Sequence, residues 1–160
     1  MSRIILGLGS NKGDKKEYLN SAYVALKGIL KNVRCSSIYQ TSPQDYVCQD
    51  DFFNMVLEGE YEGTPFSLLE EIQKIEARNG RNREKEIPKG PRTLDIDILF
   101  FEDISLNMPN LIIPHPQIEK RAFVIIPLLE LFPDFEQGGL SYKTLLPLLE
   151  DQRVNKISSL

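Results

Sequence analysis

The chain has 160 residues, of which 41% are hydrophobic and 26% are charged, and its formal net charge is −4. This balance is typical of one globular domain and excludes a disordered chain, while the negative charge argues against a general nucleic-acid-binding protein. The apolar runs are too short to span a bilayer, and the first residues are not typical of a secretory signal. We expect a single cytoplasmic domain over residues 1–160, a monomer with neither a membrane nor a nucleic-acid partner.

The basic residues gather in one segment. Residues 78–92 contain six basic and two acidic side chains, a net charge of +4, so the rest of the chain has a net charge of −8. A positive loop on an acidic protein indicates a local anionic ligand, although a solvated basic loop has the same composition. Cys35 and Cys48 are the only cysteines, and with a single histidine they form no plausible zinc site. We expect both to be reduced thiols.

The first sixty residues predict three strands and one helix. Residues 3–9 are apolar and bounded by glycines, which is typical of a buried strand. Asp14 can cap a following helix, because apolar side chains then recur at helical spacing. These positions are Leu19, Ala22, Tyr23, Leu26, Ile29 and Leu30. Strands are expected at residues 33–39 and 52–61, with a polar loop at residues 40–51 between them.

The second predicted helix has clear local signals at both ends. Thr64 is the expected N-cap, Pro65 occupies the first helical position, and Gly80 can end the helix in a left-handed turn. Its apolar positions at a spacing of three are Phe66, Leu69, Ile72 and Ile75. After the basic segment we expect a strand at residues 93–101, short helices at residues 121–131 and near 145–149, and a last strand at residues 154–157.

This order of elements predicts an α+β fold. The pattern β-α-β-β-α-β resembles the ferredoxin-like arrangement, an antiparallel sheet with both helices on one face, followed here by a C-terminal extension. The other face of the sheet would be free to hold a site, covered by loops and by the C-terminal segments. The spacing of Gly7, Gly9 and Gly13 does not match a dinucleotide-binding turn, so we interpret it as a turn from strand to helix.

Two aspartates lie in the predicted strand at residues 93–101. Side chains alternate along a strand, so Asp95 and Asp97 should share one face, their Cα atoms about 7 Å apart. The opposite face should hold the core residues Leu94, Ile96, Ile98 and Phe100. Neighbouring carboxylates repel each other unless a cation neutralises them, and Mg²⁺ is usually held by one or two carboxylates together with nucleotide phosphates. Two ions about 4 Å apart could share this pair; a solvated strand face is the alternative.

Arg92 lies just before these aspartates, at the end of the basic segment. Arginine binds phosphate in a bidentate fork and stabilises the charge that spreads over phosphoryl oxygens during transfer. Carboxylates beside arginines are therefore what phosphoryl transfer requires. The residues alone indicate metal-assisted transfer of a phosphoryl group from a nucleotide.

Residues 90–99, Gly-Pro-Arg-Thr-Leu-Asp-Ile-Asp-Ile-Leu, resemble the motif of the hydroxymethyl-dihydropterin pyrophosphokinase family of folate biosynthesis. Further segments resemble this family in order and spacing, so the similarity covers essentially the whole chain. They are Leu8-Gly9-Ser10-Asn11, residues 37–43, Phe52-Phe53-Asn54, Ile75-Glu76 with Gly80-Arg81-Asn82-Arg83, Ile113-Pro114-His115-Pro116 and Arg121-Ala122-Phe123. The chain departs from the family where Pro88 and Lys89 replace a basic residue and a tryptophan, and where Asn110 replaces a basic residue.

The resemblance implies transfer of pyrophosphate from ATP to the hydroxymethyl group of 6-hydroxymethyl-7,8-dihydropterin, with ATP as co-substrate and two Mg²⁺ ions. It implies Asp95 and Asp97 as metal ligands and Arg81 and Arg92 as the catalytic pair. It also implies a pterin stacked between two aromatic rings, with an asparagine on its hydrogen-bonding edge. The implied pterin-binding residues are Thr41, Ser42, Pro43, Gln44, Phe52, Asn54, Asp95 and Phe123. The implied ATP-binding residues are Gln73, Glu76, Arg83, Arg92, Ile98, Ile112, His115 and Arg121.

Several of these positions also have a simpler interpretation. Phe52 and Phe123 could be core aromatics, and Asn54 could satisfy a turn. The remaining alternatives are exposed helix positions for Gln73 and Glu76 and a surface loop position for His115.

Three other functions remain open at this level. A ferredoxin-like sheet with exposed aromatics can bind RNA, although the aromatic-glycine pattern of such modules is missing and the net charge is negative. A non-catalytic domain that senses a small ligand would leave the two aspartates without a metal. Another magnesium-dependent phosphotransferase would release ADP in place of AMP.

Overall fold

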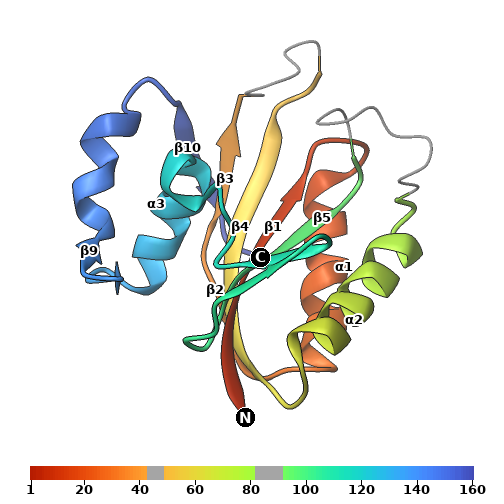
Figure 1. The fold of residues 1–160 in the computed structure, drawn as a ribbon. Helices are drawn as coiled ribbons and strands as arrows, with labels where there is room; N and C mark the ends of the chain where they lie inside the picture. The colour runs from red at the N-terminus through yellow and green to blue at the C-terminus, as the bar shows by residue number, and fades with distance from the viewer. Residues whose placement is uncertain (43–48, 82–91) are drawn as a thin grey trace.

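The computed structural model describes residues 1–42, 49–81 and 92–160. Within these residues, six strands form one antiparallel sheet in the order β10-β3-β4-β1-β5, with β2 also paired to β4 (Figure 1). The strands are β1 (Ser2–Ser10), β2 (Lys31–Cys35), β3 (Ile38–Thr41), β4 (Phe52–Tyr61), β5 (Asp95–Phe101) and β10 (Val154–Ser158). Because β1 lies between β4 and β5, the centre of the sheet depends on pairing between distant segments of the chain.

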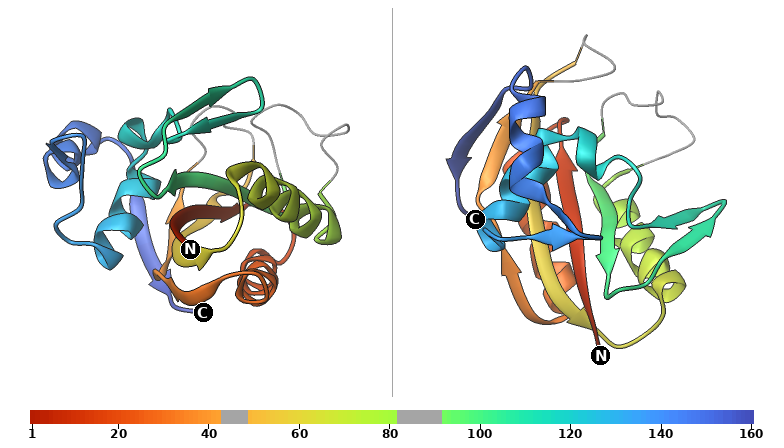
Figure 2. Two further views of the ribbon diagram at one scale, coloured as in Figure 1. Left: turned by 60° about the horizontal axis from the view of Figure 1, so that its bottom comes forward. Right: turned by 60° about the vertical axis from the view of Figure 1, so that its left-hand side comes forward.

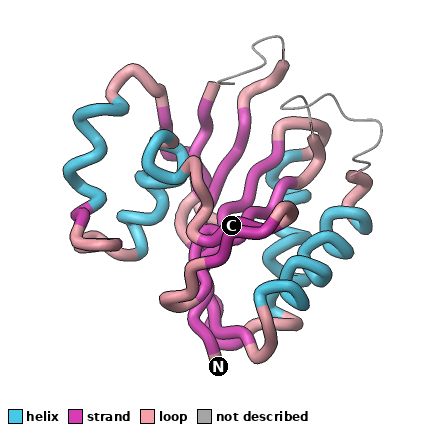
Figure 3. Tube along the Cα trace, in the orientation of Figure 1, coloured by secondary structure: helices cyan, strands magenta, loops and turns pink. Residues whose placement is uncertain are grey.

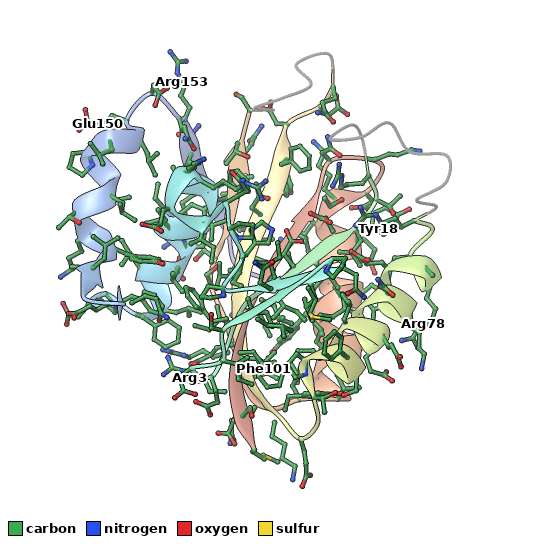
Figure 4. All side chains as sticks on the ribbon, in the orientation of Figure 1. Arg3, Tyr18, Arg78, Phe101, Glu150 and Arg153 are labelled. Atoms are coloured by element: carbon green, nitrogen blue, oxygen red, sulfur yellow. The ribbon has the colours of Figure 1, made fainter. Side chains whose placement is uncertain are left out.

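Helices cover both faces of this sheet (Figures 1 and 3). The helices α1 (Lys15–Lys27) and α2 (Pro65–Arg78) lie on one face, and α3 (Ala122–Leu131) and the 3-10 helix η2 (Tyr142–Leu149) lie on the other. Side chains fill both layers (Figure 4). Leu6, Leu57 and Leu68 belong to the core beneath α1 and α2, and Ile5 and Val56 to a second core beneath α3. The predicted α+β fold, with two helices on one face and a C-terminal extension, is confirmed.

Short elements complete the described chain. They are the hairpin of β6 (Leu106–Met108) and β7 (Leu111–Ile113), the 3-10 helix η1 (Ile118–Lys120), and the hairpin of β8 (Glu136–Gln137) and β9 (Leu140–Ser141). The β6–β7 hairpin projects past the edge strand β5, and β10 returns to the opposite edge to pair with β3 (Figure 2). None of the described helices has the length and apolar character needed to cross a bilayer.

The predicted start of α2 is confirmed. The Thr64 side chain accepts a hydrogen bond from Ser67 N, and Thr64 N donates to Ser67 Oγ, which is a reciprocal capping arrangement with Pro65 at the first helical position. The expected apolar stripe is wrong at Phe66, which is 41% exposed, whereas Leu68 is fully buried. The helical period is 3.6 residues, so a strict spacing of three drifts away from the buried face.

Two other predicted elements end or divide earlier than expected. α1 ends at Lys27, where the poor helix former Gly28 follows, so the predicted helical positions Ile29 and Leu30 lie beyond it. The predicted strand at residues 33–39 is divided into β2 and β3. Cys35 pairs with Leu57 and Tyr39 pairs with Asn54. The chain therefore advances four residues from β2 to β3 while β4 advances only three. The extra residue is accommodated at Ser36, whose Oγ accepts from Val56 N at 2.9 Å.

A β-bulge in β5 changes which residues face which core. Ile5 pairs with Phe100 and Leu6 pairs with Ile98, so Leu99 is an extra residue on β5. Leu99 and Phe100 therefore both pack in the core under α3, while Ile98 packs under α1 and α2. The expectation that Phe100 shares a face with Ile98 is wrong, because a bulge shifts the alternation by one residue.

Candidate active site

A cavity of ≈ 120 Å³ lies at the sheet beside the start of α3. The residues that line it come from β1, the end of β3, β4, β5 and α3, and from the segments that flank these elements. The predicted site residues among them are Thr41, Ser42, Phe52, Asn54, Arg92, Asp95, Asp97, Arg121 and Phe123. The face of the sheet that the element order left free for a site therefore holds the cavity.

Two glycines of β1 form the floor of this cavity. Gly9 pairs with Asp95 and Gly7 pairs with Asp97 across the antiparallel ladder. Because glycine has no side chain, the β1 residue opposite each aspartate leaves the carboxylate uncovered. A Cβ atom on Gly9 would lie only 2.9 Å from Asn54 Oδ1, closer than real contacts allow. Gly9 thus keeps open the space that the Asn54 amide occupies.

Asp95 and Asp97 both face the cavity, and Ile96 between them is buried in the opposite core. The predicted alternation is therefore present at this pair. Burial raises the pKa of Asp97 to about 8, the Asp95 carboxylate adds to the increase, and the positive charge of Arg121 opposes it. A partly buried carboxylate pair in this environment attracts a cation.

The donor set fits Mg²⁺. Among residues 1–42, 49–81 and 92–160, no group of three His, Cys, Asp or Glu side chains comes together to hold a metal. Mg²⁺ does not need such a group, because it usually binds through one or two carboxylates and completes its shell with water and substrate phosphates. Asp95 and Asp97 would hold it here.

Arg81 is buried against these carboxylates. Its Nη1 donates to Asp95 Oδ1 at 2.6 Å and to Glu76 Oε2 at 2.7 Å, and its side chain is only 4% exposed. Glu76 Oε2 also accepts from Ile96 N at 2.9 Å. The alternative that Glu76 is an ordinary exposed helix position is therefore wrong: its side chain is 2% exposed and lies beneath Arg81.

Arg92 lies near the same carboxylate oxygen. Its Nη1 lies 3.8 Å from Asp95 Oδ1, and its side chain lines the cavity. The two predicted catalytic arginines thus meet at Asp95, although they are separated by the segment at residues 82–91, which lies outside the described residues.

Most of the predicted pterin residues line the same cavity, in addition to Asp95. Phe52 from β4 and Phe123 from α3 both line it and are only partly buried, so neither is a plain core aromatic. Asn54 is 5% exposed, and its Nδ2 donates to Thr41 Oγ1 at 2.9 Å. Ser42 also lines the cavity. The remaining predicted pterin residues, residues 43 and 44, lie outside the described residues.

The predicted ATP residues are more dispersed. Arg121 lines the cavity, with its guanidinium 5.5 Å from the centre of the Phe123 ring. His115 is partly buried, its N donates to Leu99 O at 3.0 Å, and burial and Arg121 lower its pKa. By contrast, Gln73 is exposed on α2, Ile112 is exposed on β7, and Ile98 is buried in the core under α1 and α2. Arg83 lies outside the described residues.

Two polar residues at this site were not predicted. Gln49 lines the cavity, and the buried Asn11 donates to Gln49 Oε1 at 2.6 Å. The sequence places Gln49 in a polar loop and Asn11 just after the first strand. Their contact joins positions 38 residues apart, so no local pattern indicates it.

The fold and the site define a class of protein. Paired carboxylates, arginines and two aromatic rings at one cavity are typical of a metal-dependent enzyme that transfers phosphoryl groups from a nucleotide to a flat heterocyclic acceptor.

Comparison with known proteins identifies the family. The model of 7,8-dihydro-6-hydroxymethylpterin-pyrophosphokinase matches residues 5–133. The 2-amino-4-hydroxy-6-hydroxymethyldihydropteridine pyrophosphokinase of Bacillus subtilis (strain 168) is 40% identical over 141 residues, 87% of this chain and 83% of the relative. The enzyme of the same name from Methylorubrum extorquens is 38% identical over 159 residues, 98% of this chain and 99% of the relative.

Solved structures agree on the fold. The crystal structure of Plasmodium falciparum HPPK-DHPS, wild type with SDX-DHP, matches with a TM-score of 0.69 at 16% identity. The match covers 92% of this chain but only 43% of that longer chain. At this identity the likeness concerns the fold alone.

The chain belongs to the 7,8-dihydro-6-hydroxymethylpterin-pyrophosphokinase family. The family predicted from the sequence is confirmed, and so is its function as the pyrophosphokinase of folate biosynthesis. The RNA-binding, ligand-sensing and other phosphotransferase alternatives are not favoured.

Proposed function

We propose that this chain, acting as one domain, transfers pyrophosphate from ATP to 6-hydroxymethyl-7,8-dihydropterin in the cavity between β1, β4, β5 and α3. The hydroxymethyl oxygen attacks the β-phosphorus of ATP. The bond from that phosphorus to the oxygen bridging to the α-phosphorus breaks, AMP leaves, and the hydroxyl proton passes to solvent. The observation that best supports this proposal is that Asp95, Asp97 and Arg92 line one cavity together with Phe52 and Phe123, while Arg81 is bonded to Asp95.

The pterin end of the cavity suits a flat, polar heterocycle. Phe52 and Phe123 come from different elements and offer ring faces on which such a ring can stack. Asn54 is fixed by its hydrogen bond to Thr41 Oγ1, so its amide is already oriented before a ligand binds. A fixed amide reduces the entropy lost on binding and helps to set the position of the hydroxymethyl oxygen.

Asp95 and Asp97 would hold Mg²⁺, which we propose as two ions. When bound, the metal neutralises charge on the polyphosphate and orients it. The protein's own part is to fix the two carboxylates on a rigid strand and to keep Gly7 and Gly9 opposite them, so that a phosphate can approach.

Three arginines supply positive charge at this site. Arg92 and Arg121 both line the cavity and provide guanidinium groups for phosphate oxygens. Arg81 is held by Glu76 at the carboxylate pair, so we assign Glu76 to the support of Arg81 and not to ATP itself. Ile112, Gln73, His115 and Arg83 remain proposed ATP contacts, and so does Ile98.

The decisive experiment is product analysis with a metal-site variant. With ATP, Mg²⁺ and the hydroxymethyl-dihydropterin, we expect AMP and the pterin diphosphate; ADP as the product would refute the proposal. Asp97→Ala should retain the fold and lose turnover by about hundredfold or more. Asp134→Ala is the matched control, because Asp134 is exposed, pairs with Lys143 at 2.8 Å and is not among the residues that line the cavity. A near-normal rate for Asp97→Ala would remove the metal assignment.

We also propose that the enzyme works as a monomer in the cytoplasm and uses neither a membrane nor a nucleic acid. Light scattering during size-exclusion chromatography tests the first of these points. A mass of twice 18.3 kDa would contradict it.

A further inference from the structure

One buried side chain, that of Asn11, bonds to Arg92 and to the segment before β4. Asn11 follows β1, is 2% exposed and is not among the lining residues of the cavity. Its side-chain amide nevertheless bonds to residues on both sides. Arg92 N donates to Asn11 Oδ1 at 2.8 Å, and Asn11 Nδ2 donates to Gln49 Oε1 at 2.6 Å and to Asp50 O at 3.3 Å.

Asn11 bonds to both main-chain groups of Arg92, its N–H and its carbonyl oxygen. Asn11 N donates to Arg92 O at 3.1 Å, while Arg92 N donates to the Asn11 side chain. Asn11 thereby continues the β1–β5 ladder beyond its last regular pair, with a side-chain oxygen in place of a main-chain carbonyl. This fixes the backbone of Arg92, whose guanidinium lies 3.8 Å from Asp95 Oδ1.

The contact with Gln49 and Asp50 fixes the start of β4 in the same way. Gln49 lines the cavity, and Asp50 precedes Phe52 by two residues. Both N–H donors of the Asn11 amide are directed at this segment and its oxygen accepts from Arg92 N, so both ends of the amide are bonded. A satisfied buried amide of this kind holds its partners rigidly, because releasing any of them leaves a buried polar group without a partner.

We propose that Asn11 is a positioning residue for the transfer reaction, which couples the placement of Arg92 to that of Gln49 and the stacking residue Phe52. It touches neither substrate. This inference rests on the proposed function, because it assumes that Arg92 faces phosphate and that Phe52 and Gln49 face the acceptor. Aspartate would keep the acceptor for Arg92 N but lose both N–H donors, to Gln49 Oε1 and Asp50 O, and alanine would lose every side-chain contact.

The test is a double-mutant cycle in steady-state AMP formation, with kcat and the KM for the pterin measured separately. Asn11→Ala should lower kcat and raise the pterin KM, each by about tenfold, since both sets of contacts are lost. Gln49→Ala should raise the pterin KM by about tenfold and change kcat by less than about threefold. In the double variant the two KM effects should not add, because the Asn11–Gln49 bond is already absent.

Tyr61→Phe is the matched control. It deletes the partly buried hydrogen bond between Tyr61 Oη and Ser67 Oγ at the opposite end of β4, so it should lower the melting temperature without altering either kinetic constant. Asn11→Asp is the second variant should Asn11→Ala not fold. It should raise the pterin KM and leave kcat within about threefold, because the acceptor for Arg92 N remains.

The outcomes separate the two proposals. A wild-type enzyme that forms no AMP would refute the proposed function itself. An active wild type together with Asn11 variants whose kcat and KM stay within about twofold of normal would overturn the positioning role. Fully additive KM effects of Asn11→Ala and Gln49→Ala would also overturn it.

Discussion

Gly9→Ala tests the acceptor end of the site with a single methyl group. The added Cβ would lie 2.9 Å from Asn54 Oδ1, whereas ordinary contacts begin at 3.4 Å, so the amide oxygen must recede by about 0.5 Å. Asn54 is 5% exposed and its Nδ2 is bonded to Thr41 Oγ1 at 2.9 Å, so the movement strains that bond. A strained or lost neutral hydrogen bond costs about 1 kcal/mol, which corresponds to a pterin KM raised by about fivefold.

The stability of this variant should change little. Gly9 has no positive φ angle, and replacing glycine by alanine lowers the entropy of the unfolded chain, which stabilises by about 0.4–1 kcal/mol and offsets the strain. Gly7→Ala is the matched comparison on the same strand and face. Its Cβ would meet Leu99 side-chain atoms at 3.5 Å, an ordinary contact, so the pterin KM should rise by less than about threefold.

The assay is initial-rate AMP formation at varied pterin and at varied ATP, with melting temperatures measured in parallel. We expect Gly9→Ala to raise the KM for the pterin and to leave the KM for ATP unchanged. An unchanged pterin KM in a folded Gly9→Ala enzyme would show that Asn54 does not contact the acceptor. If Gly7→Ala raised the pterin KM equally, the cause would be lost cavity volume and not a displaced Asn54.

Two further predictions concern charge. Arg81→Gln removes the cation that is 2.6 Å from Asp95 Oδ1, so Mg²⁺ should bind about tenfold more tightly without nucleotide while turnover falls; calorimetric titration that finds no tighter binding would contradict this. Glu130→Gln should destabilise the protein by about 1 kcal/mol at neutral pH, because Glu130 accepts from Tyr39 Oη, Ser37 N and Ser37 Oγ. These hydrogen bonds lower the pKa of Glu130 below its ordinary 4.5, so the difference in melting temperature from wild type should be complete above that pH and disappear as the pH falls through the lowered pKa. A difference that persists undiminished at strongly acidic pH would refute the assignment.

The carboxylate pair and the capped helix could be predicted because their signals are local. Alternation along a strand depends only on neighbouring backbone angles, so Asp95 and Asp97 share a face whatever packs around them. The cap of α2 likewise needs only Thr64 and Ser67, three residues apart. Local signals also have limits, because the expected α2 stripe was wrong at Phe66 and α1 ended before Ile29 and Leu30.

The same reasoning was wrong where distant contacts decide. Phe100 left its predicted face because pairing with β1 inserts a bulge at Leu99. Glu76 carries a charge on a helix, which favours exposure, yet it is buried because Arg81 and the main chain of Ile96 satisfy it. Neither partner can be inferred from the pattern of α2 alone.

The sequence by itself determined the order of strands and helices, the family and the residue types that hold a cation and a phosphate. Only the tertiary structure decided that Arg81 is bound at Asp95, that Glu76 supports it, and that Asn11 links Arg92 to Gln49. The physical reason is the range of the interactions. Backbone alternation and capping act between near neighbours, whereas hydrogen bonds between buried polar groups form only after long-range strand pairing has brought their partners together.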